Sequence, residues 1–135
     1  MKKIYFILFL TLSLLLVSCG GSGPTTTINV TMTDFQFSPN QYTVPAGENI
    51  TLNVVNSGAV VHNFVIMKLG TKATPPFDED DQANVYWEEV DIQPGGDFST
   101  SFTAPSEPGE YQVICRTEGH IVSGMIGKLV VVAEE

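Results

Sequence analysis

Short runs in which apolar and polar residues alternate recur along the chain from residue 28 onward, with turn residues between them. Residues 49–55 (NITLNVV) alternate throughout, and Asn56, Ser57 and Gly58 follow as a turn. Alternation with a period of two is typical of β-strands that bury one face, and no stretch shows a sustained helical period. Eight strands are expected, at residues 28–32, 41–44, 49–55, 63–67, 85–92, 98–102, 110–116 and 128–132. The pattern therefore predicts an all-β sandwich.

One segment, residues 69–84, does not follow this alternating pattern. It shows no alternation, and it contains a Pro75-Pro76 pair and an acidic run from Asp78 to Asp81. Loops of this length are uncommon in compact domains and are either functional or mobile. We expect a solvated insertion whose charge aids solubility. A docking patch for a partner and a calcium loop are the alternatives, but the segment has neither the spaced ligands nor the sharp glycine turn of an EF-hand.

The N-terminal segment has the pattern of a targeting signal. Lys2 and Lys3 precede an apolar run over residues 4–17. Those residues make about 21 Å of helix, shorter than the bilayer core of about 30 Å, so a signal peptide fits better than a permanent span. Residues 16–20 (LVSCG) resemble a bacterial lipobox, in which a peptidase cuts before a cysteine that carries diacylglycerol. Cys19 is therefore the expected lipidation site; the alternative is an ordinary signal peptide with an incidental cysteine.

These features divide the chain into three parts. Residues 1–18 are expected to be a lipoprotein signal peptide, residues 19–27 a flexible lipid-anchored tether, and residues 28–135 one folded domain. Several acyl carbons, each contributing about 0.8 kcal/mol on burial, anchor a protein stably. The sequence thus predicts a domain tethered to a membrane on its extracytoplasmic side, in a periplasm or at a cell surface.

The charge of the chain narrows the choice of partners. The 135 residues carry six basic and fifteen acidic side chains, a net charge of −9 that becomes −11 once Lys2 and Lys3 leave with the signal peptide. Nucleic-acid binding needs clustered lysine and arginine, so a nucleic-acid partner is not expected. The acidity favours a protein partner with a basic docking face.

The candidate chemistry lies in a few residues near strand ends. Cys115 lies near the end of one expected strand, and His62 lies at the start of another. His120 and Met125 follow Cys115 at intervals of five residues. Two strands and one loop can therefore deliver a thiolate, two imidazoles and a thioether to one end of a sandwich. These are the ligands of a blue-copper site, in which soft sulfur suits Cu(I) and imidazole suits Cu(II).

Taken alone, each of these residues also fits an ordinary structural role. A lone buried cysteine is most often an inert small side chain, and a methionine near a strand usually belongs to the core. Zinc also binds one cysteine with two histidines, although structural zinc sites more often use close cysteine pairs, which this domain lacks. The two histidines and the only cysteine beyond Cys19 nevertheless all fall at strand ends compatible with a single site.

The chain resembles the cupredoxin family of small blue-copper proteins over residues 28–132. The resemblance is carried by the His62-Asn63 pair and by the loop from Cys115 to Met125, whose length is closest to that of auracyanin-like members. It implies a Greek-key β-sandwich that binds one copper ion through four ligands: His62, Cys115, His120 and Met125. It also implies that Asn63 links the two ligand loops and that electrons enter and leave through His120, at the exposed edge of the site.

Neighbouring residues add three expectations to this resemblance. An apolar docking patch around His120 is expected from Val60, Val61, Ile121 and Val122, with ordinary loop packing as the alternative. Glu118 stands where many relatives have proline, which removes a backbone constraint and adds negative charge near the ligands. Arg116 is close enough in sequence to pair with Glu118, although a solvated pair contributes little.

Electron transfer is the function that these features favour: single electrons carried between membrane-associated redox proteins by a monomer. Copper delivery to another protein is the alternative, although ligands on strands and in a short closed loop suit metal release poorly. A metal-free sandwich that serves adhesion or assembly is a further alternative. An enzyme is not expected, because a copper nitrite reductase needs more histidines and a binuclear oxidase centre needs two cysteines in the ligand loop.

Overall fold

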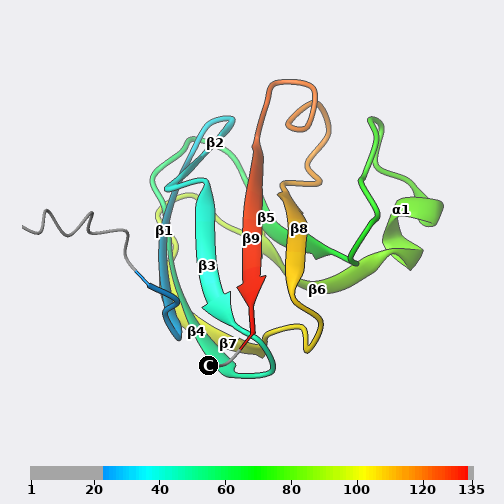
Figure 1. The fold of residues 1–135 in the computed structure, drawn as a ribbon. Coiled ribbons are helices and arrows are strands. Elements are labelled where there is room, and N and C mark those ends of the chain that lie inside the picture. The colour runs from blue at the N-terminus through cyan, green and yellow to red at the C-terminus, as the bar shows by residue number, and fades with distance from the viewer. Residues whose placement is uncertain (1–22, 134–135) are drawn as a thin grey trace, which may run out of the picture.

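The computed structural model describes residues 23–133 (Figure 1). The expected signal peptide, residues 1–18, and the expected lipidation site, Cys19, lie outside the described residues. Within the described part no helix has the length and hydropathy needed to cross a membrane. Its elements are β1 (Thr27–Thr33), β2 (Gln36–Ser38), β3 (Gln41–Pro45), β4 (Asn49–Asn56), β5 (His62–Met67), α1 (Glu79–Ala83), β6 (Val85–Ile92), β7 (Asp97–Thr103), β8 (Gly109–Ile114) and β9 (Ile126–Val132).

The strands form two sheets that pack face to face. One has four strands in the order β2-β1-β4-β7, and the other has five in the order β3-β9-β8-β5-β6. Pairing is antiparallel except that β1 runs parallel to β4 and β3 runs parallel to β9. Because the chain changes sheet after β2, β3, β4, β6 and β7, residues far apart in sequence meet in one core. The predicted all-β sandwich is confirmed.

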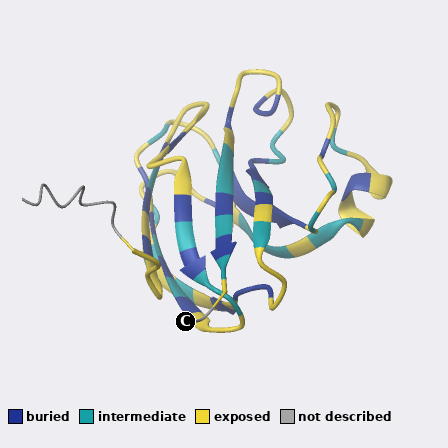
Figure 2. Cartoon of the chain, viewed as in Figure 1, coloured by how far each residue is buried: buried dark blue, intermediate teal, exposed yellow. Residues whose placement is uncertain are grey.

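Alternating residues of these strands fill the space between the sheets. In β4, Ile50, Leu52 and Val54 are fully buried, whereas the residues between them are partly exposed. Figure 2 shows buried residues alternating with more exposed ones along the strands that face the viewer. Val30 of the first sheet and Leu129 of the second belong to the same apolar cluster. Burying each such side chain contributes about 1.5–3 kcal/mol, so this cluster is what holds the sheets together.

β5 differs from the other strands because both of its faces are covered, and all six of its residues are buried. Phe64 joins the core between the sheets, whereas Val65 and Met67 belong to a second cluster that includes Ala73. Phe77 packs against this second cluster. The insertion at residues 69–84, expected as a solvated loop, therefore covers the outer face of the five-stranded sheet.

The acidic run in the insertion starts the helix α1. Asp78 is its N-cap: the carboxylate accepts hydrogen bonds from the backbone N–H groups of Asp80 and Asp81 at 2.9 and 3.0 Å. Acidic side chains stabilise the positive end of a helix, which explains why a run of carboxylates is tolerated there. The expected loop insertion therefore contains a short helix at residues 79–83, which the sequence analysis did not anticipate.

The strand count is also higher than expected, nine rather than eight in the described chain. The additional strand, β2, has three residues, too few to show an alternating pattern. It pairs with β1 in the register Thr33 to Gln36, so only Asp34 and Phe35 form the turn between them. This turn lies close to the candidate metal centre.

Candidate metal centre

Neighbouring strands bring the candidate ligands to one end of the sandwich. β5 and β8 pair antiparallel, with Val65 opposite Ile114, so the start of β5 meets the end of β8. His62 begins β5, and Cys115 directly follows β8. His120 lies in the loop from β8 to β9, at the top of Figure 1. The donor atoms of these three buried residues all lie within 4.8 Å of one another.

The spacing of the three donor atoms fits a single metal ion. Cys115 Sγ lies 3.8 Å from His62 Nδ1 and 3.3 Å from His120 Nδ1. With bonds of about 2.3 Å to sulfur and about 2.0 Å to imidazole nitrogen, a trigonal site separates sulfur from each nitrogen by about 3.7 Å. Both imidazoles therefore direct their Nδ1 atoms toward Cys115 Sγ, at about the separation expected of two ligands that share one metal ion.

Met125 closes the ligand loop from the C-terminal side. Its N–H donates to His120 O at 2.9 Å, and its carbonyl accepts from the Cys115 N–H at 3.3 Å. The Met125 side chain is fully buried. Gly119 and Gly124 have φ values of +81° and +90°, and these left-handed conformations let a short loop fold back on itself. The loop is thus fixed by its own backbone.

Asn63 and Thr117 surround the sulfur of Cys115 with polar contacts. The Asn63 N–H donates to Cys115 Sγ at 3.3 Å, and its side-chain amide donates to Thr117 Oγ1 at 2.9 Å. Thr117 Oγ1 in turn donates to Val61 O at 3.1 Å, which ties the two ligand loops together. The role of Thr117 was missed in the sequence; its position two residues after Cys115 was the only signal.

An irregularity in β6 orients Asn63. The pairing of β5 with β6 shifts register between His62 and Phe64, where Asp91 adopts a φ of +56°. This bulge aims the Asp91 N–H at Asn63 Oδ1, at 3.1 Å. Bulges commonly re-aim groups next to functional sites. With both of its amide groups bonded, Asn63 is held between β6 and the ligand loop.

The electrostatic environment keeps both imidazoles neutral. Burial lowers the pKa of His62 below its usual value of 6.5, and the nearby His120 lowers it further, while Asp34 acts in the opposite direction. Burial also lowers the pKa of His120, again opposed by Asp34. Neutral imidazole is the form that binds metal ions, so the site is prepared for a cation at neutral pH.

The expected exposure of His120 is wrong. The residue is only 4% exposed, and the ring of Phe35 packs against it in a T-shaped contact at a centroid distance of 5.1 Å. In the expected apolar patch, Val60 and Val122 are exposed, whereas Ile121 is buried in the second cluster. The apolar surface at this end of the molecule therefore includes Phe35, which the sequence did not indicate.

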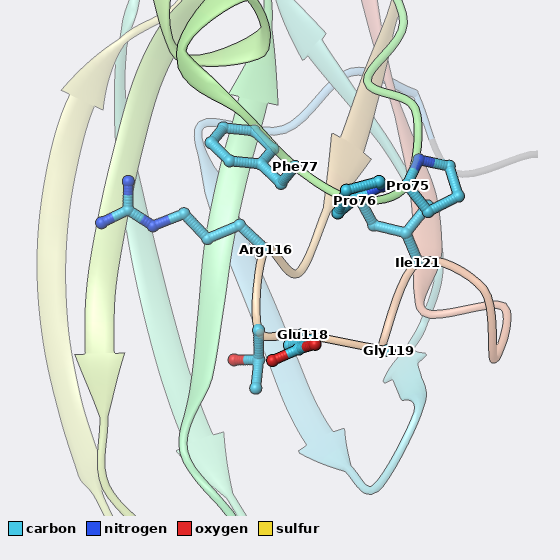
Figure 3. Close-up of a pocket in the computed structure, with 8 residues that line it drawn as sticks. Pro75, Pro76, Phe77, Arg116, Glu118, Gly119 and Ile121 are labelled. Atoms are coloured by element: carbon cyan, nitrogen blue, oxygen red, sulfur yellow. The ribbon is translucent and has the colours of Figure 1, made fainter.

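Arg116 joins the ligand loop to the insertion, and Glu88 rather than the expected Glu118 is its ion-pair partner. The guanidinium lies 3.0 Å from the Glu88 carboxylate and donates to Gln82 Oε1 at 2.6 Å. It also lies 6.0 Å from the centre of the Phe77 ring. Beside these contacts a cleft of about 290 Å³ separates the ligand loop from the prolines of the insertion (Figure 3).

The calcium alternative for the insertion finds no support in the described chain. The group formed by His62, Cys115 and His120 is the one place there where three or more histidine, cysteine or carboxylate ligands converge. The run from Asp78 to Asp81 brings no such group together.

Comparisons with known proteins place the chain among small copper proteins. The family model of a cupredoxin-like domain matches residues 6–131. Chloroplastic plastocyanin of Hordeum vulgare is 36% identical over 101 residues, which cover 70% of this chain and 54% of that protein. Plastocyanin of Mercurialis perennis is 31% identical over 106 residues, covering 73% and 89%. The chain spans about half the length of the Hordeum vulgare relative.

Solved structures with a similar fold point to the same family. Reduced auracyanin of Roseiflexus castenholzii superposes with a TM-score of 0.69 at 30% identity, over 82% of this chain and 99% of that chain. Auracyanin A of Chloroflexus aurantiacus, described as a blue copper protein, superposes with a TM-score of 0.62 at 29% identity, over 82% and 100%.

Proposed function

We propose that this chain, which belongs to the cupredoxin family, binds one copper ion and carries single electrons. The proposed ligands are His62, Cys115, His120 and Met125. The observation that carries the proposal is the convergence of two imidazole Nδ1 atoms on one buried cysteine sulfur, at 3.8 and 3.3 Å. A bound copper ion supplies the redox chemistry, alternating between Cu(II) and Cu(I). Cupredoxins are electron carriers rather than enzymes.

The donor set favours copper over zinc. A purely structural zinc site usually closes a tetrahedron with several thiolates or imidazoles, whereas here the fourth donor is the thioether of Met125. A weak thioether beside two imidazoles and a thiolate is the set that blue-copper sites use. Met125 is fully buried at the C-terminal end of the ligand loop, so its sulfur is shielded from competing water.

The surroundings of the ligands favour electron transfer over copper delivery. His62 is fully buried at the start of a strand, and Cys115 is fixed by backbone and side-chain hydrogen bonds to Met125 and Asn63. A ligand set held at the ends of two neighbouring strands and in one short, hydrogen-bonded loop changes little in geometry between oxidation states. Such a set also releases its ion slowly, which disfavours a carrier that hands the ion to another protein.

A redox titration tests the proposed function. The mature chain, loaded with one equivalent of Cu(II), is expected to show an intense visible band that disappears on reduction and returns fully on oxidation, with the copper retained in both states. Retention is measured by metal analysis after gel filtration of each form. A protein that binds only Cu(I), loses it on filtration and never shows the band would support copper delivery instead.

We propose that the mature chain is a lipoprotein on the extracytoplasmic side of a membrane, attached through Cys19. The residues 16–20 support this, because they match the pattern at which a lipidated cysteine is created. Cells that express the full chain and receive labelled palmitate are expected to incorporate the label into this protein, and C19A should be unlabelled. Labelling of the C19A protein would contradict the anchor.

We propose that the partners are redox proteins of a membrane electron-transport pathway and that they have basic docking faces. Nucleic acid is not a proposed partner, and the protein is proposed to act as a monomer. The mature charge of −11 supports a basic partner, and Asp78, Glu79 and Asp80 are exposed on the insertion beside the ligand loop. Charge complementarity of this kind speeds the encounter of two proteins and weakens with salt.

A further inference from the structure

The turn between β1 and β2 puts one side chain against each histidine of the metal centre. Asp34 Oδ1 lies 3.4 Å from His62 Nε2, and the Phe35 ring lies 5.1 Å from the His120 ring, at an interplanar angle of 82°. The turn belongs to the four-stranded sheet, whereas His62 begins a strand of the five-stranded sheet. The two sheets therefore meet at the ligands as well as in the core.

The Nε2 atom of His62 needs a hydrogen-bond acceptor, and the Asp34 carboxylate lies beside it. The ring presents Nδ1 to the sulfur of Cys115, so a neutral ligating imidazole carries its proton on Nε2. Nε2 is buried and makes no hydrogen bond within residues 23–133. The Asp34 carboxylate, at 3.4 Å, is just beyond a good hydrogen bond, so a shift of a few tenths of an ångström completes it.

Gly58 leaves the space for this contact. A β-carbon at position 58 would overlap Asp34 Oδ1 and would lie 2.8 Å from His62 Nε2. The neighbouring Ala59 N–H donates to the same Asp34 oxygen at 3.0 Å. The loop after β4 thus holds the carboxylate beside the imidazole and keeps other side chains out.

Phe35 occupies a backbone conformation that usually selects glycine or asparagine. Its φ is +67°, and the residue is 47% exposed even though its side chain is a large apolar group. Turn chemistry alone therefore does not account for phenylalanine at this position. The edge-on contact with His120 does account for it, because the ring covers an imidazole that would otherwise face water.

From these contacts we propose that the Asp34–Phe35 turn positions both imidazoles of the metal centre. The Asp34 carboxylate accepts the Nε2–H of His62 when the ion is bound, and the Phe35 ring holds His120 and keeps water from it. A carboxylate that accepts the distal N–H of a ligating histidine fixes its tautomer and orientation and strengthens it as a ligand. The proposal depends on the copper site proposed above.

Substitution of Asp34 tests the first half of the proposal. D34A is expected to lower Cu(II) affinity by about 10–100-fold, measured by competition with a chelator, and D34N by less, because the amide oxygen still accepts. The matched control is E107Q, which removes one carboxylate at the opposite end of the sandwich and should leave the affinity unchanged. Equal affinities of D34A and E107Q would overturn the proposal. If D34A does not fold, the same comparison is made with D34N.

The tautomer of His62 provides a second test, because it would not change if Asp34 only stabilised the fold. In the metal-free mature chain, ¹⁵N spectra of the imidazoles are expected to show His62 protonated on Nε2, and D34A should show a mixture of tautomers. An unchanged tautomer in D34A would overturn the role of Asp34. Because this measurement needs no metal, it stays decisive even if the wild-type chain fails to bind copper, an outcome that would refute the proposed function alone.

Phe35 is tested with glycine, the residue that its backbone conformation suits best. F35G relaxes the turn, so a purely structural role of Phe35 predicts an equal or more stable metal centre. The proposal predicts the opposite: copper is lost to a chelator about tenfold faster, because His120 is uncovered. A rate equal to or slower than that of the wild type would show that Phe35 does not hold His120.

Discussion

Replacing Cys115 with serine is expected to abolish the intense visible absorption of the copper-loaded protein. The absorption of a blue-copper site comes from charge transfer between thiolate sulfur and Cu(II), and a hydroxyl oxygen cannot supply it. Both imidazole Nδ1 atoms face the sulfur, so its removal also takes away the donor around which the site is organised. Visible spectra of the wild-type and C115S chains at one equivalent of Cu(II) measure the loss.

The control for C115S is S123A, a change of similar size at an exposed position of the same loop. S123A is expected to keep the full band, and all three proteins should have the same far-ultraviolet circular dichroism, since serine nearly matches cysteine in volume. Any Cu(II) that C115S still holds through His62 and His120 should give only weak colour. An intense band that survives in C115S would refute Cys115 as a copper ligand.

The convergence of the candidate ligands was predictable because it depends on the ends of strands and on one short loop, and because the resemblance to cupredoxins implies the same four ligands. Alternation placed His62 at a strand start and Cys115 at a strand end, and antiparallel neighbours bring such ends together. The five-residue spacing from Cys115 to His120 then limits how far the second imidazole can lie from the sulfur. None of these steps requires knowledge of how the two sheets pack.

The contacts that support the ligands depend on sheet packing and could not be predicted. Asp34 and Phe35 precede His120 by more than eighty residues and lie in the opposite sheet. Their positions follow from β2, a three-residue strand with no pattern of its own. The burial of His120 was missed for the same reason, because the ring that covers it comes from this turn.

The charge of the insertion predicted its exposure only in part. The run of carboxylates indicated solvent exposure, and Asp78, Glu79 and Asp80 are exposed, but the run starts a helix and Asp81 is only 8% exposed. The apolar residues that anchor the segment, Ala73 and Phe77, are spaced too irregularly to reveal a buried face. Arg116 then pairs with Glu88 on β6 rather than with its sequence neighbour, since the insertion and the sheet present the better-placed partner.

Truncation of Phe64 to alanine is expected to lower the free energy of unfolding of the metal-free protein by about 3–5 kcal/mol. Phe64 is fully buried between the sheets, where its ring contacts Phe37 of the first sheet and Tyr42 of the second, each at a centroid distance of 5.6 Å. Alanine leaves a cavity at this junction, and the dense core relaxes only partly. Urea denaturation in the presence of a chelator measures the change.

Two comparisons make this result specific. F64L refills most of the space, so it should lower the free energy of unfolding clearly less than F64A does. V122A, at a position that is 71% exposed, should change the free energy of unfolding by less than about 0.5 kcal/mol. A cost of F64A no larger than that of V122A would contradict the placement of Phe64 in the core.

His62 lies two residues before Phe64 on the same strand and face. The copper-loaded proteins should therefore differ by at least as much as the metal-free ones, because a cavity beneath the ligand strand weakens binding and with it the stabilisation that the ion adds.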